Sequence, residues 1–556
     1  MHDAARRVGT VTRNGTLAFC ALLLAISVLG IGRDLWTPDE PREAAISREM
    51  FVSPSVVPYL NDAPFLEKPP LYYWTVAGVF ALAGGSSAAA ARAVSIAAGF
   101  LTLLVVFVWG RREFSAGVGA AAALGLATST QFMISSHWVL IDPLVMLFTT
   151  VALWAANRLV RGEGGRAPLT LFYAPLVLAL WTKGLIGPVL VGAGLVAYSA
   201  ATRSLEPLKR LRPAIGVAVI LGSTFAFAAL LATESGLGAV REWLWVNQVQ
   251  RFVHATDETG HAQPVYYYLY TLPIAVFPWW VPFGAVLLPR TWRKEADADA
   301  GTRDKKVFLG ALSLGMAVVL SAASTKRGNY LLPLLPPLFL LLAATASEWW
   351  NRTPAGPVQG RIWTSQWLCV ALFAAVPVAL ALAYLRTSSP LAMAFLGVVA
   401  AMAAGTAIYA RRGHRAIAVR GLGALAVSAV VGVLVVAAQL AAPLKDLSPF
   451  VAWVGAQAPA DEPIYVLGDF DETIRGIVPF VTGRTAVSIA ASDLEALRPH
   501  YVLVHAKEGD VLAPQPPYVL LGVRKLGPTR SMALWERRPD RLSQLRDALE
   551  PPVPLR

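Results

Sequence analysis

Long apolar runs separated by short polar segments make up most of the chain as far as residue 441. A helix of about 20 apolar residues crosses the hydrocarbon core of a bilayer. The pattern predicts a polytopic α-helical membrane protein with thirteen such helices, near residues 15–32, 88–109, 115–135, 139–157, 168–182, 185–201, 213–233, 266–288, 307–324, 330–347, 363–385, 389–409 and 419–441.

Composition and charge support this interpretation. Only 15% of the 556 residues are charged, whereas soluble domains have about 25%, so a soluble multidomain enzyme is excluded. The net charge of +13 comes from basic residues gathered in alternate connections. By the positive-inside rule, this places the N-terminus in the cytoplasm and argues against a nucleic-acid partner. The short aromatic segment 70–84 is expected to lie at the outer interface.

The pattern changes after residue 441. Residues 442–556 alternate short β-rich runs with helix-like stretches and prolines, which is typical of a small α/β domain. The expected organisation is therefore a transmembrane domain, 1–441, with large outer loops at 33–87 and 234–265, followed by an outer α/β domain.

Acidic and basic residues from at least five segments fall on the predicted outer face. Charges at the margin of the hydrocarbon are usually paired or functional, and a single salt bridge would not need so many. Their number predicts a cavity for a polar, anionic substrate. The candidates are Asp39, Glu40, Arg42, Glu67, Lys68, Asp142, Lys183, Arg251, His261, Lys326 and Arg327.

Each candidate also has a structural interpretation. Thr37 with Glu40 could form a helix capping box, and Asp142 before Pro143 could cap the next helix. Glu67 and Lys68 could be an interfacial ion pair worth under about 1 kcal/mol. His261 could simply be packed. The joint occurrence on one face, rather than any single residue, favours a site.

Several short motifs follow one another along the chain: Trp36-Thr37-Pro38-Asp39-Glu40, Phe65-Leu66-Glu67-Lys68-Pro69, Leu140-Ile141-Asp142-Pro143, Thr182-Lys183-Gly184, and Gln250-Arg251-Phe252 followed by His261-Ala262-Gln263-Pro264. Together they resemble those of the polyprenyl-phosphate-dependent glycosyltransferases related to protein O-mannosyltransferases, and most closely the branch that transfers aminoarabinose to lipid A. The similarity covers about the first 350 residues. The sequence departs from the family pattern at Pro41 and in the looser basic segment 326–330.

The resemblance implies a membrane glycosyltransferase fold of the C type in the bacterial inner membrane, with its site at the periplasmic face. It implies a donor in which undecaprenyl phosphate carries 4-amino-4-deoxy-L-arabinose, and a lipid A phosphate as acceptor. Such a transfer confers resistance to polymyxin and cationic antimicrobial peptides.

The resemblance also suggests roles for the candidates. Asp39 is the first candidate for the catalytic carboxylate, with Glu40 and Asp142 beside it. It would be a general base for a hydroxyl acceptor, whereas for an already ionised phosphate it would hold the donor's ammonium group or stabilise oxocarbenium character. The basic residues would bind the lipid phosphate. The donor has no diphosphate that needs a Mg²⁺ clamp, so no cofactor is required, although Glu67 with His261 could hold an adventitious divalent cation.

Two other functions remain open at this stage. A sibling transferase would move a hexose or mannose to protein or surface polysaccharide, and the sequence hardly distinguishes it from an aminoarabinose transferase that acts on lipid A. A transporter for an amphiphile would usually place ionisable residues near the midplane, often with internal repeats. Here they gather at the outer ends, and no repeat of 20–50 residues is visible.

Overall fold

The computed structural model describes residues 13–253, 261–288, 300–352, 357–412, 415–507, 514, 517–526 and 530–538. The chain divides into two compact units. The first contains Met1–Gly32, Ser55–Pro58 and Phe65–Leu440. The second contains Arg33–Pro54, Tyr59–Pro64 and Ala441–Arg556, so it combines two pieces of the first predicted outer loop with the C-terminal segment.

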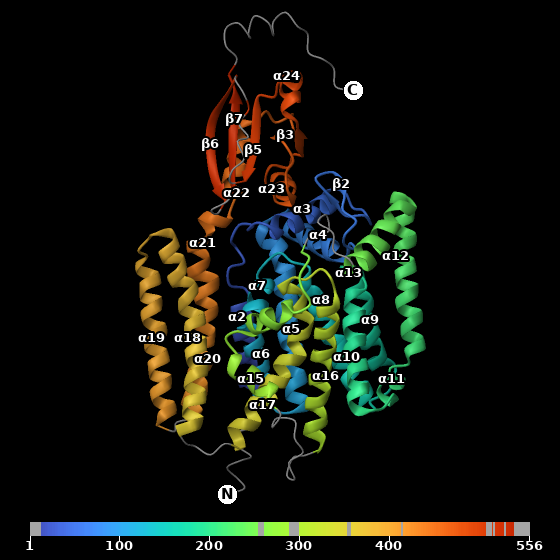
Figure 1. Cartoon of the computed structure of the whole chain (residues 1–556), viewed down its shortest axis with the longest axis vertical. Helices are drawn as coiled ribbons and strands as arrows, with labels where there is room; N and C mark the ends of the chain where they lie inside the picture. The colour runs from blue at the N-terminus through green and yellow to red at the C-terminus, as the bar shows by residue number, and fades with distance from the viewer. Residues whose placement is uncertain are drawn as a thin grey trace, which may run out of the picture. The chain divides into compact units, whose positions relative to one another are not determined.

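Helices make up the first unit (Figure 1). Helices α18, α19 and α20 pack on one another as a group, and α5 packs against both α6 and α8. The first half contains α2 (Arg13–Ser27), α4 (Leu71–Ala83), α5 (Ala88–Glu113), α6 (Ala116–Ala127), α7 (Thr130–Ser136), α8 (Asp142–Val160), α9 (Arg166–Lys183), α10 (Ile186–Thr202), α11 (Glu206–Arg210) and α12 (Pro213–Arg241). The second half contains the π-helix η1 (Glu242–Gln250), α13 (Arg251–Val253), α14 (Tyr267–Val276), α15 (Trp280–Leu287), α16 (Ala300–Ala322), the 3₁₀-helix η3 (Gly328–Leu334), α17 (Leu335–Arg352), α18 (Pro357–Leu385), α19 (Pro390–Arg411), α20 (Arg415–Val431), the π-helix η4 (Gly432–Ala437) and α21 (Ala438–Lys445).

The apolar helices confirm the polytopic architecture. Among the described residues, 8 helices are long and apolar enough to cross a membrane, or up to 9 if one bent pair counts as a single span. Helices also occupy the other predicted runs, but they are shorter, interrupted or less apolar, so the count of thirteen spans stays a prediction. Helix α4 has 13 residues, fewer than the roughly 20 that a crossing needs.

Two of the predicted continuous spans, 115–135 and 266–288, are interrupted helices. Helices α6 and α7 meet at an angle of 67°. At this bend, the hydroxyls of Thr128 and Ser129 donate to Leu124 O (2.7 Å) and Leu126 O (2.8 Å), and such bonds compete with the helical backbone pattern. Helices α14 and α15 are separated at Pro278, which lacks an N–H and disfavours helical geometry in the residue before it. Phe277 is accordingly extended, with ψ of 138°.

The predicted outer loop 234–265 is largely helical as far as it is described. The chain leaves helical geometry at Gly236 (φ 77°, ψ 175°), close to the predicted end of the span. It then becomes helical again through η1 and α13, up to Val253. Residues 254–260 of this loop lie outside the described residues.

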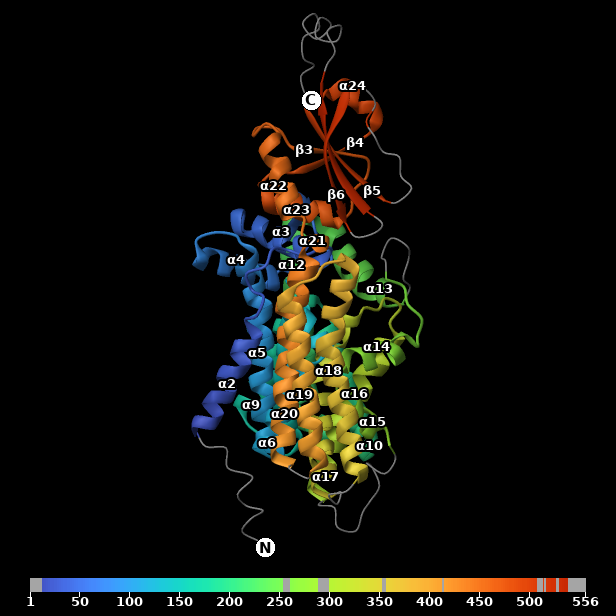
Figure 2. The ribbon, with the colours of Figure 1, turned by 90° about the vertical axis from the view of Figure 1, so that its left-hand side faces the viewer.

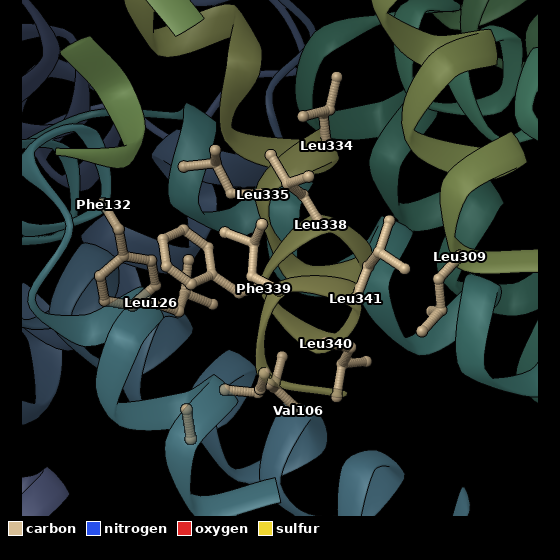
Figure 3. Close-up of a cluster of buried hydrophobic side chains, with 14 of the residues drawn as sticks. Val106, Leu126, Phe132, Leu309, Leu334, Leu335, Leu338, Phe339, Leu340 and Leu341 are labelled. Atoms are coloured by element: carbon tan, nitrogen blue, oxygen red, sulfur yellow. The ribbon is translucent and has the colours of Figure 1, made fainter. Parts of the chain in front are cut away.

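The apolar core of the first unit is centred on α17. Figure 3 shows Leu334, at the end of η3, and leucine and phenylalanine side chains of α17 up to Leu341 packed among residues of other helices. The labelled neighbours are Val106 of α5, Leu126 of α6, Phe132 of α7 and Leu309 of α16, and none of the four is more than 2% exposed. Of these helices, α16 also contributes Leu320 to the wall of the cavity described below.

The second unit contains the predicted α/β domain. Its five-stranded sheet has the order β4-β3-β5-β7-β6. Strand β3 is parallel to β4 and β5, whereas β7 is antiparallel to β5 and β6. Figure 2 shows this sheet with α22 and α23 beside it. The elements are α3 (Asp39–Val52), β1 (Tyr59–Leu60), β2 (Ala63–Pro64), α22 (Ser448–Gln457), β3 (Ile464–Leu467), α23 (Glu472–Thr482), β4 (Ala486–Ile489), η5 (Ala491–Asp493), α24 (Leu494–Leu497), β5 (Tyr501–Lys507), β6 (Tyr518–Leu526) and β7 (Arg530–Arg537).

Specific contacts join the first-loop residues to the C-terminal sheet within this unit. The Asn61 amide donates to Ala486 O and accepts from Ala486 N, both at 2.8 Å. Thr485 Oγ1 donates to Asp62 Oδ2 at 2.5 Å. Helix α3 packs directly on α23. These contacts join residues more than 400 positions apart, so the predicted loop 33–87 is divided between the two units.

The close contact of α3 with α23 gives a testable prediction. A Cβ atom on Gly476 would lie 2.5 Å from both Arg42 N and Pro41 C. Because backbone cannot yield as a side chain can, Gly476→Val is expected to destabilise the second unit by about 1–3 kcal/mol or more. Thermal unfolding and limited proteolysis in detergent would measure this. Gly397→Val is the control, since a Cβ there meets nothing within 4 Å. Equal melting of the two variants would contradict the prediction.

Candidate active site

A cavity of about 330 Å³ in the first unit brings together five of the residues predicted from the sequence: Glu67, Lys68, Asp142, Lys183 and Arg251. Much of the remaining wall is apolar. It includes Val145, Leu185, Ile186, Val189, Leu190, Val249, Phe252, Val253, Leu320, Ala323 and Pro333. The cavity therefore combines a charged part with an apolar part, as an amphiphilic ligand requires.

Asp142 and Lys183 form one buried ion pair of the cavity. Asp142 is the first residue of α8, and Lys183 ends α9, which packs beside α8. Lys183 Nζ donates to Asp142 Oδ1 at 2.5 Å, and Asn329 Nδ2 donates to Oδ2 at 2.8 Å. The side chains of Asp142 and Lys183 are only 9% and 11% exposed. The N-cap of α8 is Ile141, and the Asp142 oxygens bond to Lys183 and Asn329, so the capping alternative for this residue is wrong.

Glu67, Lys68 and Arg251 form the second charged group. Arg251 Nη1 and Nη2 donate to Glu67 Oε2 and Oε1 at 2.7 and 3.3 Å, a two-pronged contact. Lys68 Nζ is 3.3 Å from Oε2 of the same carboxylate. Asn247 accepts a further bond from Arg251 at 3.4 Å. Glu67 and Lys68 thus belong to a group of charges instead of forming an isolated pair.

The charge balance of the cavity favours an anion. Three basic groups, Lys68, Lys183 and Arg251, face two carboxylates, Glu67 and Asp142, which leaves a formal charge of +1. Lys183 Nζ also lies 4.2 Å from the ring centroid of Tyr330. Arginine and lysine beside each other suit phosphate oxygens, since the guanidinium binds in a planar fork and the ammonium as a point charge.

Glu40 lies in the second unit and is saturated by protein donors. Arg33 binds both carboxylate oxygens, at 2.5 and 3.1 Å, and Trp36 N donates to Oε2 at 2.8 Å. Glu40 is fully buried. This geometry favours a structural role for Glu40, which anchors residues 33–36 to the first turn of α3. Thr37 does not cap α3, whose N-cap is Pro38 without a side-chain bond.

Arg42, also in the second unit, is surrounded by carboxylates. It contacts Asp39 at 3.3 Å, Glu43 at 2.6 Å, and Glu472 on α23. Burial alone would lower the pKa of the Arg42 guanidinium, but Glu43, Glu472 and Asp39 raise it well above its usual value. The contacts with Asp39 and Glu472 connect the candidate catalytic carboxylate, which is 8% exposed, to the C-terminal sheet domain.

His261, Lys326 and Arg327 do not line the cavity of the first unit. Lys326 is 3% exposed, and its ammonium group donates to the backbone carbonyls of Gln263 (2.8 Å) and Ala323. Its backbone N–H donates to His261 O at 3.1 Å. Arg327 O accepts from Tyr268 at 3.1 Å. These contacts fasten the segment after residue 260 to the end of α16.

The structure adds no third ligand to the weak metal candidate, Glu67 with His261. Within the described ranges, no group of three or more His, Cys, Asp or Glu side chains could hold a metal ion. Both Glu67 oxygens are in contact with Arg251.

Comparison with known proteins supports the fold. The family model for dolichyl-phosphate-mannose-protein mannosyltransferase matches residues 14–234. A crystal structure of ArnT from Cupriavidus metallidurans bound to undecaprenyl phosphate superimposes with a TM-score of 0.72 and 21% identity, covering 94% of this chain and 98% of that chain. The chain has the fold of ArnT. The predicted membrane glycosyltransferase fold of the C type is therefore confirmed.

Curated relatives are similar over a shorter range. Undecaprenyl phosphate-alpha-4-amino-4-deoxy-L-arabinose arabinosyl transferase of Pectobacterium atrosepticum is 31% identical over 331 residues, 57% of this chain and 56% of the relative. The enzyme of the same name from Aeromonas salmonicida is 33% identical over 336 residues, 57% of each chain. The chain thus matches a little over half the length of these ArnT-type relatives.

Sequence reasoning missed some of the cavity residues. Tyr330 lines the cavity and stands in a segment that was noted only for its basic residues. Its neighbour Asn329 is not part of the lining but donates to Asp142 of the Asp142–Lys183 pair. Gln248 was not noted at all, yet it lines the cavity. The available signal was the pair of adjacent amide residues, Asn247 and Gln248, just before the Gln250-Arg251-Phe252 motif.

Proposed function

We propose that the chain is a glycosyltransferase of the inner bacterial membrane that transfers 4-amino-4-deoxy-L-arabinose from undecaprenyl phosphate to a phosphate of lipid A. The single observation that supports this best is the cavity of the first unit, where Lys68, Lys183 and Arg251 stand next to an apolar wall. The names of the curated relatives supply the sugar and the carrier lipid. The lipid A acceptor follows from the resemblance of the motifs.

The proposed orientation follows the positive-inside rule. The N-terminus is cytoplasmic, and the C-terminal sheet domain is periplasmic, where lipid A is modified. Added aminosugar reduces the negative charge of lipid A, so the proposed transfer confers resistance to polymyxin and other cationic peptides.

In the proposed mechanism, an ionised oxygen of the acceptor phosphate attacks the anomeric carbon. The bond from this carbon to the donor phosphate oxygen breaks, and its electron pair leaves with undecaprenyl phosphate. Lys68 and Arg251 neutralise the charge that grows on the leaving phosphate, usually the largest catalytic contribution in such sites. Asp39 is assigned, on its motif, to the donor ammonium or to the positive charge developing on the sugar. Direct displacement inverts the anomeric centre.

Mass spectrometry of lipid A tests the proposal. The host would lack its own transferase but make the undecaprenyl donor, and it would express the wild-type chain, Asp39→Ala or the control Asp461→Ala, whose side chain is exposed. Lipid A with an added pentosamine is expected from the wild type and the control, but not from Asp39→Ala. Unmodified lipid A in well-expressing wild-type cells would contradict the proposal.

The second candidate is a sibling transferase that moves a mannose or another hexose to protein or surface polysaccharide. The observation in its favour is the mannosyltransferase family model, which matches residues 14–234. Analysis of glycoproteins and polysaccharides in the same cells would reveal this activity.

A further inference from the structure

Gln248 lines the cavity of the first unit. It lies in the π-helix η1, three residues before Arg251, and it lines the same cavity as the Asp142–Lys183 pair and the Glu67–Lys68–Arg251 group. Short π-helical segments are rare, and they are frequent at functional sites.

The orientation of the Gln248 amide follows from its one hydrogen bond to a described residue. The backbone N–H of Leu185 donates to Gln248 Oε1 at 3.0 Å. A backbone N–H needs an acceptor, so the oxygen of the amide must face Leu185 and the NH₂ group must face away from it. The side chain is therefore anchored at its oxygen while its two N–H donors remain at the other end.

The turn of residues 183–185 leaves room for the Gln248 amide because its middle residue is a glycine. Gly184, between Lys183 and Leu185, has a φ of 77°, and a Cβ atom there would lie 2.2 Å from Gln248 Oε1 and 2.7 Å from Nε2. A side chain at this position would both strain the backbone and displace the amide. The glycine of the Thr182-Lys183-Gly184 motif thus leaves space for Gln248.

The donors of the amide nitrogen have no protein acceptor in the part of the chain that the structure describes, where the contact with Leu185 uses only the oxygen. The nearby carboxylates are already engaged by cations, Glu67 by Arg251 and Asp142 by Lys183. Partly buried donors normally find a partner. In a cavity with a net positive charge, an oxygen of a bound anion is the acceptor that fits.

We propose that Gln248 is a donor-binding residue, whose amide N–H₂ donates to an oxygen of the phosphate–sugar headgroup of the polyprenyl donor. This inference rests on the proposed function for the presence of that donor. Beside the charged groups of Lys68 and Arg251, Gln248 would provide a neutral, directional hydrogen bond that positions the headgroup in the cavity.

Two substitutions distinguish this role from a purely structural one, in which Gln248 only holds η1 against the turn of residues 183–185. Gln248→Glu keeps an oxygen for the Leu185 N–H but removes both donors and adds a negative charge. Gln248→Met is close in size and removes donors and acceptor together. The matched controls are Gln250→Glu and Gln250→Met, because Gln250 lies on the same π-helix but does not line the cavity.

The experiment measures binding to the purified full-length chain in detergent, by titration with undecaprenyl phosphate and, separately, with the sugar-linked donor. Gln248→Met is expected to weaken binding about 10-fold and Gln248→Glu about 100-fold, as for the loss of a hydrogen bond to a charged group. Both controls should bind like the wild type. Thermal melting of each variant checks that it is folded. If Gln248→Met does not fold, Gln248→Glu still tests the proposal, because its carboxylate can accept the hydrogen bond from Leu185 N–H.

The two ligands distinguish the possible acceptors. Equal weakening for both ligands assigns the contact to the phosphate, whereas weakening for the sugar-linked donor alone assigns it to the sugar. If the wild type and a folded Gln248→Glu variant bind both ligands equally well, the proposed role of Gln248 is overturned, but the proposed function is not. If the wild type binds neither ligand, the proposed function is wrong, and this inference is overturned with it.

Discussion

An Asp39→Asn variant is expected to transfer sugar about 100- to 1,000-fold more slowly than the wild type, as for the loss of one electrostatic stabiliser, while it binds undecaprenyl phosphate normally. The amide has the shape of the carboxylate but not the charge that the proposed mechanism needs. Binding should persist because Lys68, Lys183 and Arg251, which line the cavity, are untouched. The fold should persist because Arg42 keeps Glu43 and Glu472 as partners. The measurements are initial transfer rates and a binding titration.

The matched control for this prediction is Glu495→Gln, an exposed carboxylate on α24 in the same unit. It should transfer at the wild-type rate. Transfer by Asp39→Asn within a few-fold of the wild type would reject Asp39 as the catalytic carboxylate.

A Lys183→Met variant is expected to lose about 3–5 kcal/mol of stability, because it leaves the charge of buried Asp142 without its cation. Asn329 would remain as a partner at 2.8 Å, but a neutral amide does not balance the charge. A marked fall in the melting temperature of the detergent-purified protein is therefore expected. The same variant should also bind undecaprenyl phosphate more weakly, since the cavity loses one of its three basic groups.

A double variant separates the two effects. Lys183→Met with Asp142→Asn removes both charges and should recover most of the lost stability without recovering transfer, as expected for two residues in direct contact. Lys209→Met, at an exposed lysine outside the cavity, is the control for the loss of a lysine. A double variant no more stable than Lys183→Met would show that the ion pair is not the source of the instability.

The sequence was most informative where a local pattern is sufficient. A run of apolar residues must be helical in a bilayer, because every backbone group needs a partner within the segment. The predicted runs accordingly coincide with helices, and the alternating β-rich runs after residue 441 form the five-stranded sheet. The prediction was wrong about continuity in two runs, where Ser129 and Pro278 interrupt the helix by local hydrogen bonding and by the absent N–H.

Candidate residues could be selected from the sequence, but their partners could not. Asp142 and Lys183 were both singled out, since charges are rare beside apolar runs, yet nothing local shows that they pair with each other. Lys326 was selected for the same reason, but its ammonium group binds backbone carbonyls. Gln248 was not selected because it is neutral, and the bond that orients its amide comes from the distant Leu185 N–H.

By itself, the sequence determined the membrane class, the approximate positions of the helices, the α/β character of the C-terminal segment and all five charged residues that line the cavity. Hydrophobic periodicity and the cost of burying charge act over a few residues, so they can be read along the chain. Only the tertiary structure decided that residues 33–54 join the C-terminal sheet, and which base neutralises which carboxylate. Those outcomes depend on packing between segments up to 430 positions apart, as in the contact of Arg42 with Glu472, and no local pattern encodes them.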